Sequence, residues 1–219
     1  MTDDRVQKNN FLVQDWGLLD YDLAYQRQKA IVETAQASYT DYLIFCEHPA
    51  VLTMGRLAAQ RNILAPEAIL DKKRVQTRMI DRGGDVTLHC PGQLVVYPIL
   101  RLTAGQRDLR VYLEKLEKVA IDLLSDFDIV SNSVSGKTGV WVGPKKIVSI
   151  GIGVRRWVTF HGLALNVNND LSLFELIRPC GMDLVMTSMR EVLGTAVEMA
   201  AVRHKFSAHF QKVFGYGPG

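Results

Sequence analysis

Residues 82–98 read RGGDVTLHCPGQLVVYP, in which a pair of glycines and a compact turn lead into an apolar run. The run Leu94–Leu100 has the length and the β-branched and aromatic content of a strand. Glycines let a backbone approach a ligand closely, and the segment His89–Gln93 has the residues of a turn. A β-hairpin would explain much of this pattern. It would not require Arg82, His89 and Gln93, which can converge as polar groups on one pocket.

Further strand-like runs lie on both sides of this stretch, and several are bounded by glycine or proline. They are Tyr42–Cys46, Val51–Met54, Val75–Ile80, Val140–Val142, Ile147–Val154 and Leu163–Val167. Helical patterns precede and follow these runs, which predicts an α/β (α+β) fold with a mixed sheet flanked by helices. Because no internal repeat or low-complexity stretch interrupts the chain, we expect a single domain over residues 1–219.

The helical patterns have recognisable starts and stripes. Asp20 can cap a first helix. Its packed positions are expected to be Leu23, Arg27, Ala30 and Ile31. A second helix is predicted over Leu109–Phe127, with a stripe formed by Leu109, Leu113, Leu116, Ala120 and Leu123. Nearer the C-terminus, Ser188 and Glu191 match a capping box. The last stripe consists of Val202, Phe206, Phe210 and Val213.

The composition excludes several classes of protein. A hydrophobic share of 47% in 219 residues can bury a sizeable core without disulfides or metals. The net charge of +3 is too small to indicate nucleic-acid binding, although it would favour encounter with an acidic protein. The polar start MTDDRVQKNN lacks the features of a secretory signal, and no apolar run reaches the roughly 20 residues that span a bilayer. We therefore expect a cytoplasmic protein without a membrane segment.

The three cysteines, Cys46, Cys90 and Cys180, indicate free thiols rather than a disulfide framework. Cys46 lies in the apolar run YLIFC and fits a buried, inert thiol. Cys180 lies between proline and glycine, where we expect an exposed turn, and a nearby cation would lower its pKa and make it a nucleophile. By composition alone, a structural role stays open for each cysteine. The spacing of histidines and cysteines predicts no metal site.

Five stretches occur in the order seen in lipoyl(octanoyl) transferases. They are EHPAVLTMGR (47–56), RGGDVTLHCPGQLVVYP (82–98), GVWVGPKKIVSIG (139–151), FHGLALNV (160–167) and RPCGM (178–182). The chain resembles this family from about residue 11 to about residue 191. The resemblance implies an α/β fold shared with the catalytic domains of biotin and lipoate protein ligases. It also implies a donor, octanoyl-acyl carrier protein, and acceptors, the lipoyl domains of 2-oxoacid dehydrogenases and the glycine cleavage H protein.

The resemblance assigns roles to individual residues. In the family, the cysteine of the PCG motif carries the acyl group as a thioester, which maps to Cys180, and the lysine that begins the KI strand maps to Lys146. The implied substrate-binding residues are Arg82, Gly83, Gly84, His89, Gly92, Gln93, Ser149, Ile150, Gly151, His161, Gly162, Leu163 and Ala164. His48 and Cys90 are further pocket candidates, although a histidine near a strand end is as often an ordinary surface residue.

Cys90 departs from the family, which usually has glycine at this position. If glycine is used there for a positive φ, a cysteine would strain the turn or narrow the pocket. Alternatively, Cys90 lies near Cys180 and can be oxidised with it or acylated in its place. A tolerated small substitution is the third possibility.

The implied chemistry needs no ATP, metal or other cofactor. Exchange of one thioester for another has little free-energy cost, and the amide product is more stable than a thioester. A desolvated Lys146 with a lowered pKa could act as the base in both steps. Alternatives are an ATP-dependent lipoate protein ligase, an amidotransferase between lipoyl domains, and a non-catalytic module that binds an acyl chain or carrier protein.

Overall fold

The turn within residues 82–98 joins two different sheets. A computed structural model describes residues 10–178 and 184–217. In it, β5 (Val86–His89) belongs to a three-stranded sheet and β6 (Gln93–Ile99) to a seven-stranded sheet. The two strands therefore do not form the hairpin that the sequence pattern would permit. Instead the turn carries the chain from one sheet to the other. It brings the side chain of His89, at the end of β5, within hydrogen-bond distance of Gln93, at the start of β6.

The seven-stranded sheet is mixed, as predicted. Its order is β1-β2-β6-β10-β9-β8-β7, and only the β1–β2 pair is parallel. The bounds of these strands are β1 Asn10–Leu18, β2 Thr40–Glu47, β7 Asn132–Val134, β8 Lys137–Val142, β9 Lys145–Arg155 and β10 Val158–Asn166. The central strands β6 and β10 are buried along their whole length, because helices cover both faces of the sheet.

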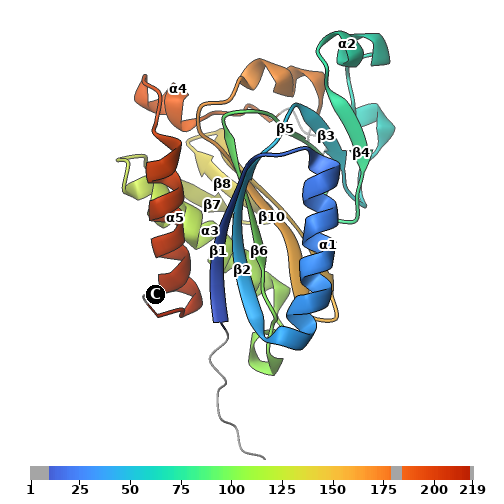
Figure 1. Cartoon of the computed structure of the whole chain (residues 1–219). Helices are drawn as coiled ribbons and strands as arrows, with labels where there is room; N and C mark the ends of the chain where they lie inside the picture. Colours follow the sequence, from blue (N-terminus) through green and yellow to red (C-terminus); the bar gives the residue numbers. More distant parts are fainter. Residues whose placement is uncertain (1–9, 179–183, 218–219) are drawn as a thin grey trace, which may run out of the picture.

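Alternate residues of each central strand face opposite layers, as the pleat requires. In β2, Leu43 and Phe45 pack toward α3 (Leu109–Ser125) and α5 (Met199–Phe214), whereas Ile44 and Cys46 pack toward α1 (Tyr21–Ser38). Figure 1 shows α1 on one side of the sheet and α5 on the other. The predicted stripe of α5 is confirmed for its three fully buried residues, Val202, Phe206 and Phe210.

Helix α1 begins as predicted but packs through a different face. Asp20 caps it by accepting the amide hydrogens of Asp22 and Leu23. The expected stripe through Leu23 and Arg27 is wrong, since both side chains are exposed. The buried positions are Tyr21, Ala24, Gln28, Val32 and Ala35. Alanines allow the helix to approach the sheet closely, and the amide of Gln28 is buried because it bonds the backbone of β10.

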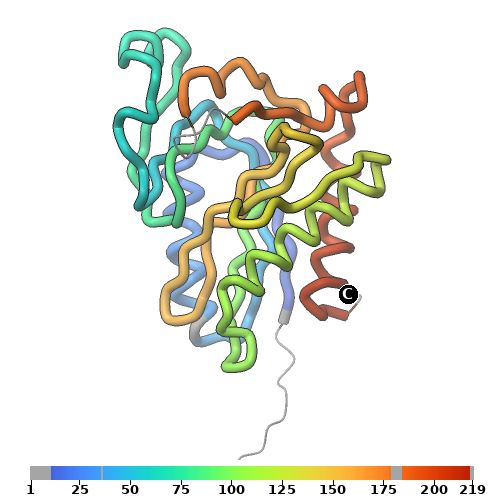
Figure 2. Tube along the Cα trace, turned by 180° about the vertical axis from the view of Figure 1, so that it is seen from behind, coloured from blue at the N-terminus to red at the C-terminus, as the bar shows by residue number. Residues whose placement is uncertain are grey.

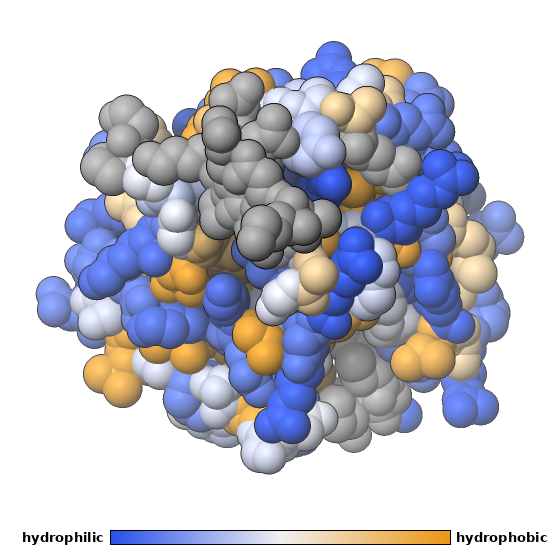
Figure 3. Space-filling model, turned by 90° about the horizontal axis from the view of Figure 1, so that it is seen from below, coloured by the Kyte–Doolittle hydropathy of each residue, from blue (hydrophilic) through white to orange (hydrophobic). Residues whose placement is uncertain are grey.

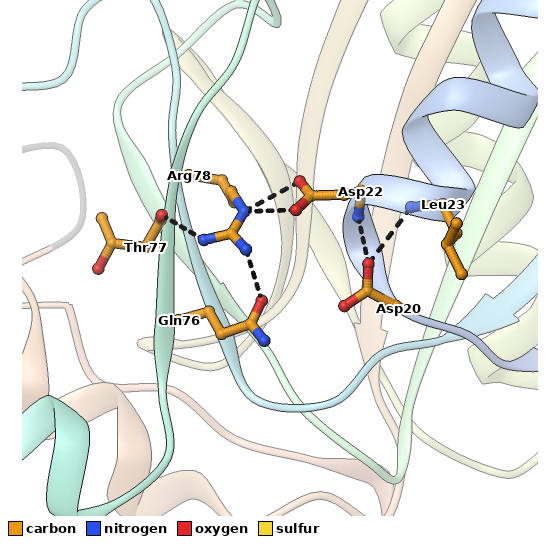
Figure 4. A network of polar contacts seen from close by, with 6 residues as sticks. All are labelled: Asp20, Asp22, Leu23, Gln76, Thr77 and Arg78. Carbon is orange, nitrogen blue, oxygen red and sulfur yellow. Dashed lines mark hydrogen bonds and ion pairs between the residues drawn. The ribbon is translucent and has the colours of Figure 1, made fainter.

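The three-stranded sheet has the order β4-β3-β5 and forms its own hydrophobic cluster with a 3-10 helix, η3 (Leu171–Leu176). The other two strands of this sheet are β3 Val51–Met54 and β4 Gln76–Met79, and the helix α2 Glu67–Lys72 lies between them in sequence. Figure 4 shows how the sheet is tied to α1: the Nε atom of Arg78 donates to both carboxylate oxygens of Asp22 at 2.9 and 2.8 Å. The small sheet is thus held beside the start of α1.

The remaining elements are short: η1 Gln60–Asn62, η2 Ala104–Gln106 and α4 Met189–Leu193. Ser188 caps α4 through the amide of Glu191, but the Glu191 side chain bonds Lys145 instead of closing the predicted capping box. On the face seen in Figure 3, hydrophobic side chains lie in small groups between hydrophilic ones. Among the described residues, no helix has the length and apolar character needed to cross a membrane.

Candidate active site

A cavity of about 400 Å³ lies where the two sheets meet. The loop before β5, β5 itself, β6, β8, β9 and β10 form its wall, with single residues from α1 and α3. Its size falls in the range of small-molecule sites, which combine an apolar wall with a few placed polar groups. Here the charged and imidazole side chains are those of Arg82, Asp85, His89, Lys137, Lys146 and His161.

Lys146 is almost fully buried at the second position of β9, with 8% of its surface exposed. Its Nζ atom donates to the carbonyl oxygen of Thr138 at 3.0 Å and lies 5.0 Å from the centre of the Trp141 ring. Its backbone pairs with the segment that follows the RPCGM motif in sequence: Lys146 N donates to Val185 O, and Thr187 N donates to Lys146 O, both at 2.9 Å. The ammonium is therefore positioned on the cavity wall by its own strand and by residues 185–187.

His89 faces the cavity as a neutral imidazole whose tautomer can be assigned. Gln93 donates its side-chain amide to Leu88 O at 3.1 Å and to the Asn166 side-chain oxygen at 2.9 Å, so its own oxygen is the acceptor at 2.8 Å from His89 Nδ1. Nδ1 must then carry the hydrogen, and Nε2 keeps a lone pair. Burial lowers the pKa of His89 to about 3. The cavity wall thus holds a histidine that can accept a hydrogen bond.

His48 lies behind this wall rather than on it. Its Nδ1 is 2.7 Å from Leu19 O, which can only accept, and its Nε2 therefore accepts the hydroxyl hydrogen of Tyr97 at 2.6 Å. Burial lowers the pKa of His48 to about 4. The ring packs edge-on against Tyr21 and His89, at 5.2 and 5.8 Å between ring centres. Its geometry is that of a support for side chains on the wall.

His161 occupies an unusual backbone position in β10, with φ at 55°. Few residues other than glycine adopt this left-handed conformation, and such strain concentrates at functional sites. Gln28 accepts its backbone N–H at 2.9 Å, and Asp81 Oδ1 accepts from Nε2 at 2.9 Å. The hydrogen bond from His161 lowers the pKa of Asp81 to about 2, while burial lowers the pKa of His161. The pair is therefore a neutral imidazole bonded to a carboxylate.

Arg82 fixes the loop that precedes β5. Its Nη2 atom donates to Thr53 at the backbone oxygen, at 2.6 Å, and at the hydroxyl, at 3.0 Å. Its Nη1 atom donates to Gly83 O at 3.0 Å, and Gly83 N in turn donates to Ile152 O at 2.8 Å. The arginine therefore connects the small sheet, the glycine loop and β9 along one side of the cavity.

Cys90 does not strain the turn in which it replaces the family's usual glycine. It is not among the described residues with positive φ, whereas Gly92 has φ at 86°. A Cβ atom added at Gly92 would lie 2.8 Å from Asn169 N, so glycine is required at that position instead. Cys90 is 1% exposed, packs in the cluster of the small sheet, and has its pKa raised to about 11 by burial. This supports a tolerated substitution and a thiol that stays protonated.

Comparison with known proteins places the chain in a family. The model of the lipoyl protein ligase A/B catalytic domain matches residues 20–211. An octanoyltransferase from Solibacter usitatus is 41% identical over 208 residues, which cover 94% of each chain. The chain belongs to the octanoyltransferase family. Another member, from Caldicellulosiruptor bescii, is 46% identical over 178 residues, which cover 80% of this chain and 78% of its relative.

Solved structures confirm the predicted fold of this family member. A lipoate-protein ligase A crystallised with ATP superposes with a TM-score of 0.78 at 15% identity and covers 94% of this chain and 85% of its own. A biotin protein ligase from Aquifex aeolicus, in complex with biotin and ATP, superposes with a TM-score of 0.58 at 15% identity. The superposition covers 94% of this chain and 70% of the ligase. At such low identity the likeness concerns the fold alone.

The structure of this octanoyltransferase family member brings most of the predicted site residues together. Those on the cavity wall are Arg82, Gly83, Gly84, His89, Lys146, Ser149, Ile150, Gly151, His161, Gly162, Leu163 and Ala164. Four others lie off the wall: His48, Cys90, Gly92 and Gln93. Cys180 lies outside the described residues. The binding roles of all these residues remain predictions.

Sequence reasoning missed several wall residues. They are Tyr21, Asp85, Val86, Thr87, Val95, Tyr97, Leu113, Gly136, Lys137, Thr138, Trp141 and Ile152. Those within the quoted stretches could have been found, since alternate residues of a strand next to a site face the same side. Tyr21 and Leu113 carry no such signal, because they reach the cavity from helices that are distant in sequence.

The buried histidines predict how stability depends on pH. In the unfolded chain, His48 and His89 bind protons near the ordinary histidine pKa, whereas burial holds their folded-state pKa at about 4 and about 3. The unfolded state then binds more protons, so the free energy of unfolding should fall as the pH is lowered from about 6.5 toward 4. Each histidine should contribute up to about 1.4 kcal/mol per pH unit in this window. Urea unfolding at several pH values measures the slope.

Single substitutions apportion this slope. His48→Gln and His89→Gln should each lower it by one histidine's share. An unchanged slope in both buried variants would show that these histidines are not held neutral by the fold.

Proposed function

We propose that the chain transfers an octanoyl group from octanoyl-acyl carrier protein to a lysine of a lipoyl domain, through a thioester on Cys180 and with Lys146 as the proton carrier. One observation carries this proposal. The Lys146 ammonium faces the cavity of about 400 Å³ between the two sheets, and its backbone pairs with Val185–Thr187, the segment that follows Cys180 by five to seven residues. The names of the octanoyltransferase relatives agree with the proposed reaction.

The two described thiols are poor candidates for the nucleophile. Cys46 and Cys90 are each 1% exposed, and burial raises their pKa to about 12 and about 11. Thiolates, not thiols, attack thioesters, so neither residue would react appreciably near neutral pH. We therefore propose Cys180, the third cysteine of the chain, as the nucleophile.

In the first half-reaction, the Cys180 thiolate attacks the carbonyl carbon of the octanoyl thioester. The proton of the thiol has passed to Lys146. The bond between the carbonyl carbon and the carrier's sulfur breaks, and the carrier leaves as a thiol after taking the proton back from the ammonium. One thioester replaces another, so the step needs no activating nucleotide. A positioned proton carrier of this kind contributes typically about 10² to 10⁴-fold in rate.

In the second half-reaction, the amine of the acceptor lysine attacks the thioester on Cys180. The new carbon–nitrogen bond forms, the carbon–sulfur bond breaks, and Lys146 accepts the proton that the amine loses or returns it to the departing thiolate. The acceptor is an ammonium with an ordinary pKa near 10.4, so a base is needed before it can attack. The amide product is more stable than the thioester, which drives the transfer forward.

The cavity can hold the apolar chain of the acyl group. Its apolar wall residues include Val86, Val95, Leu113, Trp141, Ile150, Ile152, Leu163 and Ala164. At about 0.8 kcal/mol for each buried CH₂, an eight-carbon chain gains several kcal/mol of binding. Chains longer than the cavity would lose this gain, so the cavity depth should set the length preference.

The test is direct. The purified chain is incubated with octanoyl-acyl carrier protein without ATP, its intact mass is measured, and the adduct is mapped by peptide analysis. We expect one octanoyl group on Cys180, which disappears when a lipoyl domain is added. A second arm supplies free octanoate with ATP. Octanoylation of an added lipoyl domain only in that arm would support an ATP-dependent ligase of the same fold, and stoichiometric binding without an adduct would support a non-catalytic module.

A further inference from the structure

Helix α3 places a carboxylate behind the site, at Glu117. This residue is half-buried, in contrast to the exposed Glu114 one turn earlier on the same helix. Its Oε1 atom accepts the backbone N–H of Gly139 in β8 at 2.9 Å. Figure 2 shows the β7–β8 hairpin passing over α3, and Glu117 makes a hydrogen bond between α3 and β8. The established family assignment gives this glutamate no role.

A single peptide group connects the Glu117 carboxylate to the Lys146 ammonium. The carbonyl oxygen of Thr138, which accepts the Lys146 ammonium at 3.0 Å, and the N–H of Gly139 belong to the same peptide unit. A peptide unit is planar, and its C=O and N–H point in opposite directions in the trans form. The carboxylate therefore holds one end of this dipole, and the ammonium is bonded to the other end. Hydrogen bonds arranged in this way polarise and strengthen one another.

Gly139 makes the arrangement possible. Its φ is 135°, and a Cβ atom there would lie 2.5 Å from Lys146 Cε and 2.5 Å from Val148 O. Any side chain would push the lysine out of its position over the peptide. The Lys146 side chain therefore packs directly against the Thr138–Gly139 peptide, and Glu117 bonds the other end of that peptide. This arrangement lets the carboxylate orient the ammonium.

We propose that Glu117 is a positioning residue for Lys146: through the Thr138–Gly139 peptide it orients the ammonium and stabilises its charged form. The inference rests on the proposed function of Lys146. Because the charged ammonium is the partner of a Cys180 thiolate, Glu117 would favour the ion pair from which acylation starts. Burial raises the pKa of Glu117, and the Gly139 N–H and the Lys146 charge oppose that rise, which is the expected coupling between the two groups.

Other charged groups lie on the cavity wall and on the elements that surround Glu117 and Lys146. Lys137 of β8 also lines the cavity, and Arg82 lies on the wall formed by the glycine loop. Lys145 of β9 is paired with Glu191 of α4 at 2.6 Å, and on α3 Glu114 is paired with Arg110 and Lys118 with Asp122. Asp85, His89 and His161 lie on the same cavity wall, and under the proposed function Cys180 is a further titratable group. These pairings leave Glu117 as the described carboxylate bonded to the peptide that holds Lys146.

Glu117→Gln separates charge from hydrogen bonding, because its side-chain oxygen can still accept from Gly139, whereas Glu117→Ala removes both. Glu114→Gln and Glu114→Ala are matched controls on the same helix. The rate of thioester formation is measured against pH, and the titration of Lys146 is followed by NMR of ε-labelled lysine in the absence of substrate. Removing an opposite charge lowers a lysine pKa. We expect the Lys146 titration and the alkaline limb of acylation to move down by about one pH unit in Glu117→Gln.

Glu117→Ala should show the same shift and a further loss of about tenfold in acylation rate, because the peptide is no longer held. Melting curves establish that both variants are folded. If the Glu117 variants match the Glu114 controls in both measurements, Glu117 has no positioning role. Absence of any thioester in the unaltered chain would instead refute the proposed function, and the NMR titration would still decide whether Glu117 acts on Lys146.

Discussion

Replacing Cys180 with serine is expected to reduce octanoyl transfer by about 10³-fold or more, because it removes the group that forms the covalent intermediate. A serine hydroxyl has a far higher pKa than a thiol, so a base matched to a thiol would leave it protonated. The transfer rate to a lipoyl domain is measured together with the intact mass of the enzyme. The fold should be unaffected, since the change replaces one atom.

The other two cysteines supply matched controls. Cys46→Ser and Cys90→Ser change the same atom at buried positions outside the proposed chemistry, so they should lower the melting temperature more than the activity. Their thiols have pKa values raised to about 12 and about 11, which is why they should not take over from Cys180. An active Cys180→Ser enzyme that carries the acyl adduct on Cys90 would overturn the assignment.

The sheet could be predicted where strands are continuous apolar runs. Val51–Met54 coincides with β3, and Leu94–Leu100 differs from β6 by one residue at each end. Strand β1 was missed because NFLVQDWGL mixes polar and apolar residues at an edge of the sheet, where one side needs no burial. Strand β5 was not named as a strand of its own, because its four residues lie between the glycine pair and the turn in a segment whose pattern a hairpin would explain.

The packing face of α1 could not be predicted from apolar spacing. Gln28 is fully buried, and its oxygen accepts the N–H of His161, a residue with a left-handed backbone. That hydrogen bond arises only when the helix meets β10. The stripe chosen from sequence followed Leu23, which is half exposed. A polar residue thus decides the helix orientation at the place where the site is built.

The residues of the candidate site also divide into those that the sequence predicted and those that only the folded chain shows. The five motifs predicted half of the wall residues, since the loop 82–84 and strands β9 and β10 are contiguous stretches that all line the cavity. The contact between Glu117 and Gly139 has no sequence signature, because it joins a helix to a hairpin 22 residues later. The same holds for Tyr21 and Leu113. Residues that act through another residue, or that reach a site from a separate layer, become visible only in the folded chain.

Replacing Lys146 with alanine is expected to lower octanoyl transfer by about 10² to 10⁴-fold, the range found when a positioned acid–base group is removed. Lys146 donates to the Thr138 oxygen at 3.0 Å on the cavity wall, and no other described lysine occupies this position. Both half-reactions should slow, since each needs a proton taken or returned. Single-turnover measurements of thioester formation and of its transfer to the acceptor separate the two.

Lys145→Ala is the control, because this adjacent lysine points to Glu191 at 2.6 Å and away from the cavity. Its loss should leave both half-reactions nearly unchanged. Lys146→Arg keeps the positive charge but holds its proton at all accessible pH values, so it should support thiolate formation while failing as a base for the acceptor amine. The second half-reaction should therefore slow more than the first. Equal rates in Lys146→Ala and the unaltered enzyme would mean that another group carries the proton.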